Sequence, residues 1–230
     1  MTNDVQILNN GYPMPAVGLG VYKIADEQME EVVRTALDAG YRAFDTAYFY
    51  GNEKALGSAL KHSNVERDEL FITSKLWNDY QGYDQTIEYF NKSLDNLGLD
   101  YLDLFLIHWP CENDQLYIES YKALEHLYEE GKIKAIGVCN FKIHHLEKLM
   151  KETKITPQVN QIELHPYFNQ QDVQDFCDEH DIKVTAWMPL MRNKGLLDDP
   201  VITDIAHRYD KTPAQIVLRS EEHTSELQSP

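Results

Sequence analysis

The chain has 230 residues, 43% of them hydrophobic, which is enough apolar material for the core of one ordinary domain. Acidic residues outnumber basic ones by 38 to 21, and the formal net charge of −17 would repel nucleic-acid phosphates and anionic lipids. Because no stretch approaches the ~18 apolar residues of a membrane span and the first residues show no signal-peptide pattern, we expect a cytosolic protein without nucleic-acid or membrane partners.

The first predicted element is a small hairpin. Short runs at residues 5–8 and 12–14 flank Asn10 and Gly11, a pair that readily adopts the positive φ angles of a tight turn. We expect this hairpin to cover the bottom of the fold and to take no part in chemistry.

After the hairpin, short β-branched or apolar runs alternate with longer stretches of helical period, which is the pattern of βα units around a parallel sheet. One helical stretch carries an apolar stripe of Met29, Val33 and Leu37, and another stops at Gly98. No linker rich in Pro, Gly or Ser divides the chain, so we expect one domain. The predicted strands lie at about residues 16–20, 41–45, 70–75, 102–107, 133–138, 157–161 and 182–187.

Two parallel architectures fit this order, a closed barrel and an open doubly wound sheet. The open dinucleotide-binding sheet favours a G-x-G-x-x-G motif after its first strand. The segment from Gly18 to Lys23 contains two glycines in the required places and lacks the third. This partial match is too weak to select the open sheet.

The ends of three neighbouring predicted strands carry polar residues that could work together. Asp45 ends the second strand and Tyr50 lies in its loop, Lys75 ends the third strand, and His108 follows the fourth. In a parallel barrel these ends meet around one mouth. Each residue alone has a structural explanation, such as bonding a turn or packing on a loop.

Together the four residues make chemical sense. An ammonium beside a tyrosine lowers the tyrosine pKa from its usual ~10, and a carboxylate keeps a buried lysine charged. An imidazole can orient a carbonyl oxygen beside the tyrosine hydroxyl, as general acid catalysis requires. The sequence therefore predicts an acid–base site of Asp45, Tyr50, Lys75 and His108.

The cysteines Cys111, Cys139 and Cys177 are odd in number and widely spaced, which argues against disulfides and a zinc knuckle. We expect three reduced thiols.

The histidines also form no metal-binding motif. His144 and His145 stand beside Glu147 in a predicted helix, where a solvated face is favoured over a metal site. The segment from His108 to Cys111 has ligand-like spacing but contains a proline and has no further ligand nearby. We therefore expect no metal.

Residues 40–57, GYRAFDTAYFYGNEKALG, resemble a signature of the aldo-keto reductase family, and residues 136–141, IGVCNF, resemble its second signature. Residues 74–77 and 108–110 match the family's third and fourth strand ends, and the resemblance extends to about residue 219. It is strongest with short-looped bacterial members similar to 2,5-diketo-gluconate reductases. The resemblance implies a (β/α)₈ TIM barrel, monomeric as many members are, that reduces aldehydes or ketones with NADPH.

The resemblance also implies a role for each site residue. Tyr50 is the proton donor, Lys75 and Asp45 tune it, and His108 positions the carbonyl while a hydride passes from the nicotinamide. The implied cofactor contacts are Gly20, Val21, Asp45, Cys139, Asn140, Gln161, Trp187, Pro189 and Leu190. The implied substrate contacts are Tyr22, Phe49, Trp77, His108 and Trp109.

Three of the implied cofactor contacts have specific tasks. Asn140 and Gln161 are amides that can donate and accept at once, which suits the nicotinamide carboxamide. Trp187 stacks on the nicotinamide ring. Cys139 stands where many members have serine, and a thiol bonds more weakly than a hydroxyl.

The final segment departs from the family, which continues into an eighth strand, a basic segment that binds the cofactor 2′-phosphate, and a tail that closes the pocket. Residues 220–230, SEEHTSELQSP, are polar and show neither strand alternation nor that basic segment. We expect residues 1–219 to form a barrel domain without its eighth strand and C-terminal tail, and residues 220–230 to be a non-family tail or artefact. Such a barrel would leave two strand edges unpaired.

Two other functions fit the same barrel. A Schiff-base aldolase would use Lys75 as its nucleophile, although a nearby Asp45 opposes this because a salt bridge raises the pKa of the lysine. A non-catalytic subunit would keep the nucleotide pocket without turnover. Complete retention of the four acid–base residues favours the reductase.

Overall fold

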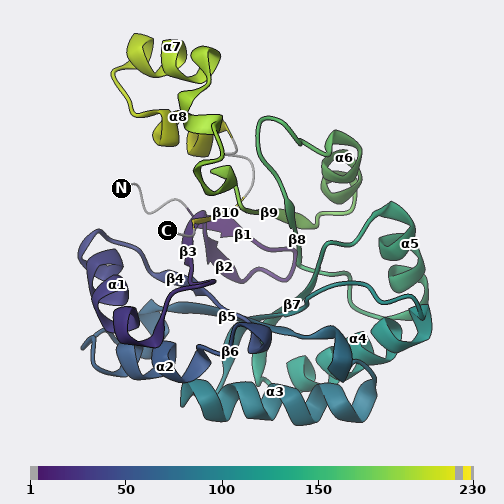
Figure 1. Cartoon of the computed structure of the whole chain (residues 1–230). Helices are drawn as coiled ribbons and strands as arrows, with labels where there is room; N and C mark the ends of the chain where they lie inside the picture. Colours follow the sequence, from purple (N-terminus) through teal and green to yellow (C-terminus); the bar gives the residue numbers. More distant parts are fainter. Residues whose placement is uncertain (1–4, 221–224, 229–230) are drawn as a thin grey trace.

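The computed structural model describes residues 5–220 and 225–228. These residues form a closed barrel of parallel strands in the order β10-β3-β4-β5-β6-β7-β8-β9, with helices around its outer face (Figure 1). The barrel strands are β3 (Val17–Gly20), β4 (Ala43–Asp45), β5 (Phe71–Leu76), β6 (Leu102–Ile107), β7 (Ile133–Cys139), β8 (Val159–Glu163), β9 (Lys183–Trp187) and β10 (Ser225–Gln228). The predicted TIM barrel is confirmed.

Helices follow the barrel strands in alternation, except that the last two both lie between β9 and β10. They are α1 (Asp26–Asp38), α2 (Glu53–Lys61), α3 (Tyr83–Leu97), α4 (Asp114–Glu129), α5 (Ile143–Glu152), α6 (Gln171–Glu179), α7 (Pro200–Tyr209) and α8 (Pro213–Ser220). Short 3₁₀ turns lie between them at η1 (Tyr48–Tyr50), η2 (Arg67–Glu69), η3 (Asn78–Tyr80), η4 (Met191–Asn193) and η5 (Leu196–Asp198). Among the described residues, no helix has both the length and the apolar character needed to cross a membrane.

The first seven barrel strands begin and end within two residues of the predicted positions. Strands β5 and β6 are buried along their whole length, because helices cover their outer side and the barrel interior covers the other. The apolar stripe of α1, including Met29, Val33 and Leu37, packs on this sheet. Helix α3 ends as predicted at Gly98, which has a φ of 66°.

The predicted hairpin is confirmed as β1 (Val5–Ile7) paired antiparallel with β2 (Pro13–Pro15). Leu8 and Met14 are buried in a cluster with Phe71 and Ala43, the first residues of β5 and β4. The hairpin therefore closes the end of the barrel at which the strands begin.

The expectation that the barrel has no eighth strand is wrong. Strand β10 pairs parallel with both β3 and β9, with Glu226 opposite Val17 and Ser225 opposite Thr185. Pairing of this kind requires only backbone donors and acceptors, and the edges of β3 and β9 offer them whatever the side chains are. Residues 221–224 and 229–230, also part of the expected non-family tail, lie outside the described residues.

Helix α2, which follows the loop of Tyr50, lies very close to the end of α3. Gly57 faces the backbone of Leu97, and a β-carbon at this position would overlap the Leu97 carbonyl oxygen. The absence of a side chain at Gly57 therefore sets how closely α2 approaches α3.

We predict that Gly57→Ala lowers the free energy of unfolding by about 1–3 kcal/mol, because backbone atoms cannot move aside as a flexible side chain would. The overlap outweighs the ~1 kcal/mol by which alanine is favoured over glycine inside a helix. Chemical denaturation of the variant measures the loss. The control is Ser58→Ala, at an exposed position of the same helix. Equal stability of Gly57→Ala and the wild type would contradict the prediction.

Candidate active site

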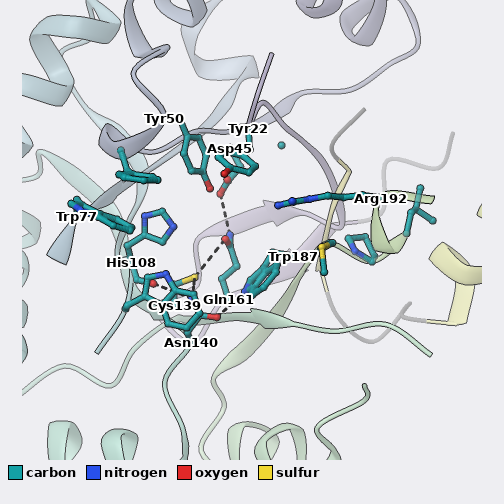
Figure 2. Close-up of a pocket in the computed structure, with 16 residues that line it drawn as sticks. Tyr22, Asp45, Tyr50, Trp77, His108, Cys139, Asn140, Gln161, Trp187 and Arg192 are labelled. Atoms are coloured by element: carbon teal, nitrogen blue, oxygen red, sulfur yellow. Dashed lines mark hydrogen bonds between the residues drawn. The ribbon is translucent and has the colours of Figure 1, made fainter. Parts of the chain in front are cut away.

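A pocket opens at the carboxyl ends of the barrel strands, and Figure 2 shows the side chains that line it. The lining residues are Gly20, Tyr22, Asp45, Phe49, Tyr50, Trp77, His108, Trp109, Cys139, Asn140, Gln161, Trp187, Met188, Pro189, Leu190 and Arg192. Of the predicted site residues, only Val21 and Lys75 are not among them, and both are fully buried beneath the surface. Met188 and Arg192 line the pocket and were not predicted.

Asp45 and Lys75 form the predicted ion pair, in which Asp45 lines the pocket and Lys75 is buried beneath it. The Lys75 side chain is 0% exposed and that of Asp45 is 4% exposed. The Lys75 ammonium donates to Asp45 Oδ1 and, at 2.9 Å, to the backbone carbonyl of Thr46. Burial alone lowers the pKa of Lys75, but the charges of Asp45 and Tyr50 outweigh burial and raise it. Lys75 is therefore held as a cation.

Tyr50 lies above this pair, with the Lys75 ammonium 5.2 Å from the centroid of its ring. Burial raises the pKa of Tyr50 to about 12, and the positive charge of Lys75 offsets only part of this rise. The net pKa of Tyr50 therefore lies above its ordinary value, an outcome that the spacing of the residues did not predict. The charge acts in the predicted direction, but desolvation of the phenolate is the larger effect.

His108 is 8% exposed and lies beside Tyr50, with their ring centroids 5.8 Å apart. Burial and, to a smaller extent, the positive charge of Lys75 together lower the pKa of His108 to about 3. The imidazole is therefore neutral at ordinary pH. Its Nδ1 atom finds no hydrogen-bond partner within the described ranges.

The loop that presents Tyr50 is held by buried polar residues that the sequence did not single out. The side chain of Asn52 donates to the Val21 carbonyl at 2.8 Å and accepts from the Thr46 hydroxyl at 2.8 Å. The Glu53 carboxylate accepts from the hydroxyl of Ser74, next to Lys75, at 2.7 Å. These bonds fix the loop to the same strands that carry the ion pair.

Aromatic rings form the wall of the pocket on the side of His108. Phe49 stacks on Trp77 with centroids 3.8 Å apart, and Trp77 meets the His108 ring edge-on at 5.1 Å. Trp109 lies across from Trp187 at 6.5 Å. This arrangement gives the predicted substrate side a largely apolar surface.

On the opposite side lie two amides, Asn140 just after β7 and Gln161 on β8, together with the indole of Trp187. Trp187 Nε1 donates to Asn140 Oδ1 at 2.8 Å, and Asn140 Nδ2 donates to the His108 carbonyl at 3.1 Å. Gln161 Nε2 donates to Asp45 Oδ2 at 3.0 Å. Gln161 lies within β8 rather than at its end, because the strand continues to Glu163. The predicted residues of this side are thus brought together, and Gln161 links them to the Asp45–Lys75 pair.

Arg192 lines the pocket but was not among the predicted residues, which end at Leu190 in this segment. Its guanidinium lies 5.3 Å from the centroid of the Tyr22 ring, and its backbone has a φ of 49°. The sequence did contain one signal for Arg192. It is a positively charged residue two positions after Leu190, the last predicted cofactor contact, in a chain of net charge −17.

Within the described residues, no group of three or more His, Cys, Asp or Glu side chains is arranged so that it could hold a metal ion. His144 and Glu147 are exposed on α5, as predicted, whereas His145 is half-buried with its ring against Tyr117 and Phe141. The three cysteines are free.

The sequence model of the Aldo/keto reductase family matches residues 16–227 of the chain. The chain is 49% identical to glyoxal reductase of Bacillus subtilis (strain 168) over 217 residues. This alignment covers 94% of the present chain and 78% of the reductase. The crystal structure of an aldo/keto reductase from Brucella melitensis has a TM-score of 0.95 and 44% identity, covering 100% of this chain and 89% of that one. A Gox0644 mutant in complex with NADPH has a TM-score of 0.94 and 39% identity, covering 100% and 84%.

We predict that removing the charge of Lys75 raises the pKa of His108 from about 3, while burial keeps it below the ordinary value of 6.5. The double variant Asp45→Asn/Lys75→Met avoids leaving a buried carboxylate unpaired. Histidine NMR titrations of this variant and the wild type measure the change, with circular dichroism as the control for folding. The same His108 pKa in both proteins would contradict the electrostatic coupling.

Proposed function

The chain belongs to the aldo/keto reductase family, and on that premise we propose that it reduces the carbonyl group of small aldehydes and ketones with NADPH. The observation that carries this proposal is Tyr50 at the floor of an aromatic pocket, beside a neutral His108 and above the buried Asp45–Lys75 pair.

Tyr50 is proposed as the proton donor. With its pKa raised to about 12, its phenol holds its proton at neutral pH and can release it as negative charge develops on a carbonyl oxygen. The Lys75 ammonium stabilises the phenolate that this transfer leaves behind. Asp45 keeps Lys75 in place and charged.

His108 is proposed to orient the substrate. A neutral imidazole can donate a hydrogen bond to the carbonyl oxygen, whereas an imidazolium would compete with Tyr50 as the acid. The pKa of about 3 makes the neutral form the relevant one. His108 and Tyr50 together would hold the oxygen at one point of the pocket.

The opposite side of the pocket suits a nicotinamide cofactor. Trp187 offers an aromatic face, and the carbonyl oxygen of Asn140 keeps a lone pair beyond the one used by the indole. We propose that Gly20, Pro189 and Leu190 border the ribose and pyrophosphate, and that Arg192 supplies positive charge near the phosphates. When bound, NADPH supplies the hydride.

Small, uncharged carbonyl compounds are the proposed substrates. The side of the pocket beyond Tyr50 is bordered by aromatic side chains and offers no carboxylate, ammonium or guanidinium group among Tyr22, Phe49, Trp77, His108 and Trp109. Burial of a short dicarbonyl against such rings excludes water from the reacting carbon. The glyoxal reductase of Bacillus subtilis bears a name that agrees with this class.

The geometry weighs against the aldolase alternative. An imine at Lys75 would require the amine to reach the substrate, yet Lys75 is 0% exposed, does not line the pocket and is paired with Asp45. A non-catalytic nucleotide-binding subunit would need none of the acid–base residues. Both alternatives predict no oxidation of NADPH by an added aldehyde.

We also propose that the enzyme is a cytosolic monomer that acts independently of nucleic acids. The net charge of −17 opposes binding to phosphate backbones. Analytical ultracentrifugation tests the monomer.

We predict that the wild type oxidises NADPH when glyoxal or methylglyoxal is added and that Tyr50→Phe lowers kcat by about 10²–10⁴-fold. Affinity for NADPH should change little, because only the transferable proton is lost. Steady-state absorbance and calorimetric binding measure the two quantities. Turnover of Tyr50→Phe close to that of the wild type would rule out the assignment of the donor.

We predict that Trp187→Ala weakens NADPH binding by about fivefold or more, since it removes a stacking face. Trp187→Phe keeps an aromatic face and should retain more of the affinity. Calorimetric titration gives the affinities, and thermal unfolding shows whether any loss reflects stability instead. If both variants bind NADPH as the wild type does, Trp187 serves only in packing.

A further inference from the structure

The Cys139 thiol lies between the two amides of the pocket and bonds to both. Asn140 Nδ2 donates to Cys139 Sγ at 3.1 Å, and Cys139 Sγ donates to Gln161 Oε1 across 3.7 Å. The thiol therefore uses its acceptor toward one amide and its S–H toward the other. Figure 2 shows it between Asn140 and Gln161.

These bonds are part of a longer chain in which each donor points the same way. Trp187 donates to Asn140, Asn140 to Cys139, Cys139 to Gln161, and Gln161 to Asp45. Trp187 ends β9, Asn140 follows β7, and Cys139 ends β7. Gln161 lies in β8, and Asp45 ends β4. The chain thus joins the proposed stacking residue to the ion pair beneath Tyr50.

Reversal of either amide would break this order. If Gln161 turned its amide over, its NH₂ group would face the thiol and its oxygen would face the carboxylate of Asp45. If Asn140 turned over, its NH₂ group would face the indole N–H of Trp187. Cys139 is 2% exposed, and burial raises the pKa of its thiol, so that the S–H is retained and can donate.

We propose that Cys139 is a positioning residue, which fixes the amide orientations of Asn140 and Gln161 before the cofactor binds. The inference rests on the proposed function, because the family resemblance assigns Asn140 and Gln161 to the carboxamide of the nicotinamide cofactor that is proposed there. Since its S–H and one of its two lone pairs are engaged with the amides, we infer that the thiol acts through Asn140 and Gln161 rather than as a direct ligand of the cofactor. This refines the sequence-based expectation that Cys139 contacts the cofactor.

The first test uses three variants of the full chain. Cys139→Ala removes both bonds, whereas Cys139→Ser keeps a group that donates and accepts. Cys177→Ala is the matched control, because Cys177 is a fully buried thiol that receives a weak bond from the Asn160 amide and does not line the pocket. Calorimetry measures NADPH affinity, and thermal unfolding measures stability.

We expect Cys139→Ala to weaken NADPH binding by about 3- to 10-fold, the effect of losing roughly one hydrogen bond. Cys139→Ser should stay within about twofold of the wild type. Cys177→Ala should lower the melting temperature and leave NADPH affinity unchanged. Wild-type affinity in Cys139→Ala, or equal losses in the alanine and serine variants of Cys139, would overturn the proposal.

The second test needs no cofactor and therefore separates this inference from the proposed function. In a Cys111→Ala/Cys177→Ala background, Cys139 gives the infrared S–H stretching band of the apo protein. A donated S–H absorbs at lower frequency than a free one, so Gln161→Leu should shift the band upward. An unshifted band would overturn the proposal even in an active enzyme, whereas a shifted band in an enzyme without turnover would contradict the proposed function alone.

Discussion

The buried pair of Asp45 and Lys75 is the interaction on which the rest of the site depends. An ammonium with no access to water is stable only beside a negative charge, and β4 and β5, which are paired neighbours, bring that charge to it. Asp45 also accepts from Gln161 on β8, which stands opposite β4 in the strand order of the barrel. The bond therefore spans the bore, and closure of the barrel sets the position of the pair.

The same pair sets the protonation of its neighbours through opposing effects. Desolvation of Tyr50 favours the neutral phenol and outweighs the nearby ammonium. For His108, desolvation and the ammonium act together, and both favour the neutral imidazole. Both groups are therefore uncharged: burial keeps the phenol neutral although the cation makes it easier to ionise, whereas burial and the cation both keep the imidazole neutral. A carbonyl between them would meet two neutral donors.

Hydrophobic periodicity located the strands, and the polar residues at their ends gave the four acid–base residues. The closed barrel and the cofactor and substrate contacts came from the family resemblance, because the residue pattern alone also fitted an open sheet. Three features depended on tertiary context. The pKa of Tyr50 rises because of burial, which sequence spacing does not measure. Strand β10 forms from a polar segment between two strand edges. Arg192 reaches the pocket because its loop turns back over Tyr22, a path that no local pattern indicated.

Asn140 must satisfy two structural requirements, one of its backbone conformation and one of its side chain. Its backbone is in the left-handed region, with a φ of 63°, where glycine and asparagine are most easily accommodated. Its side chain bridges the ends of β6, β7 and β9. Glycine would satisfy the backbone and lose the bridge, whereas glutamine would keep an amide and strain the backbone. Random mutagenesis should therefore find almost no acceptable replacement at this position, and libraries aimed at new substrates should leave it fixed and vary the aromatic wall.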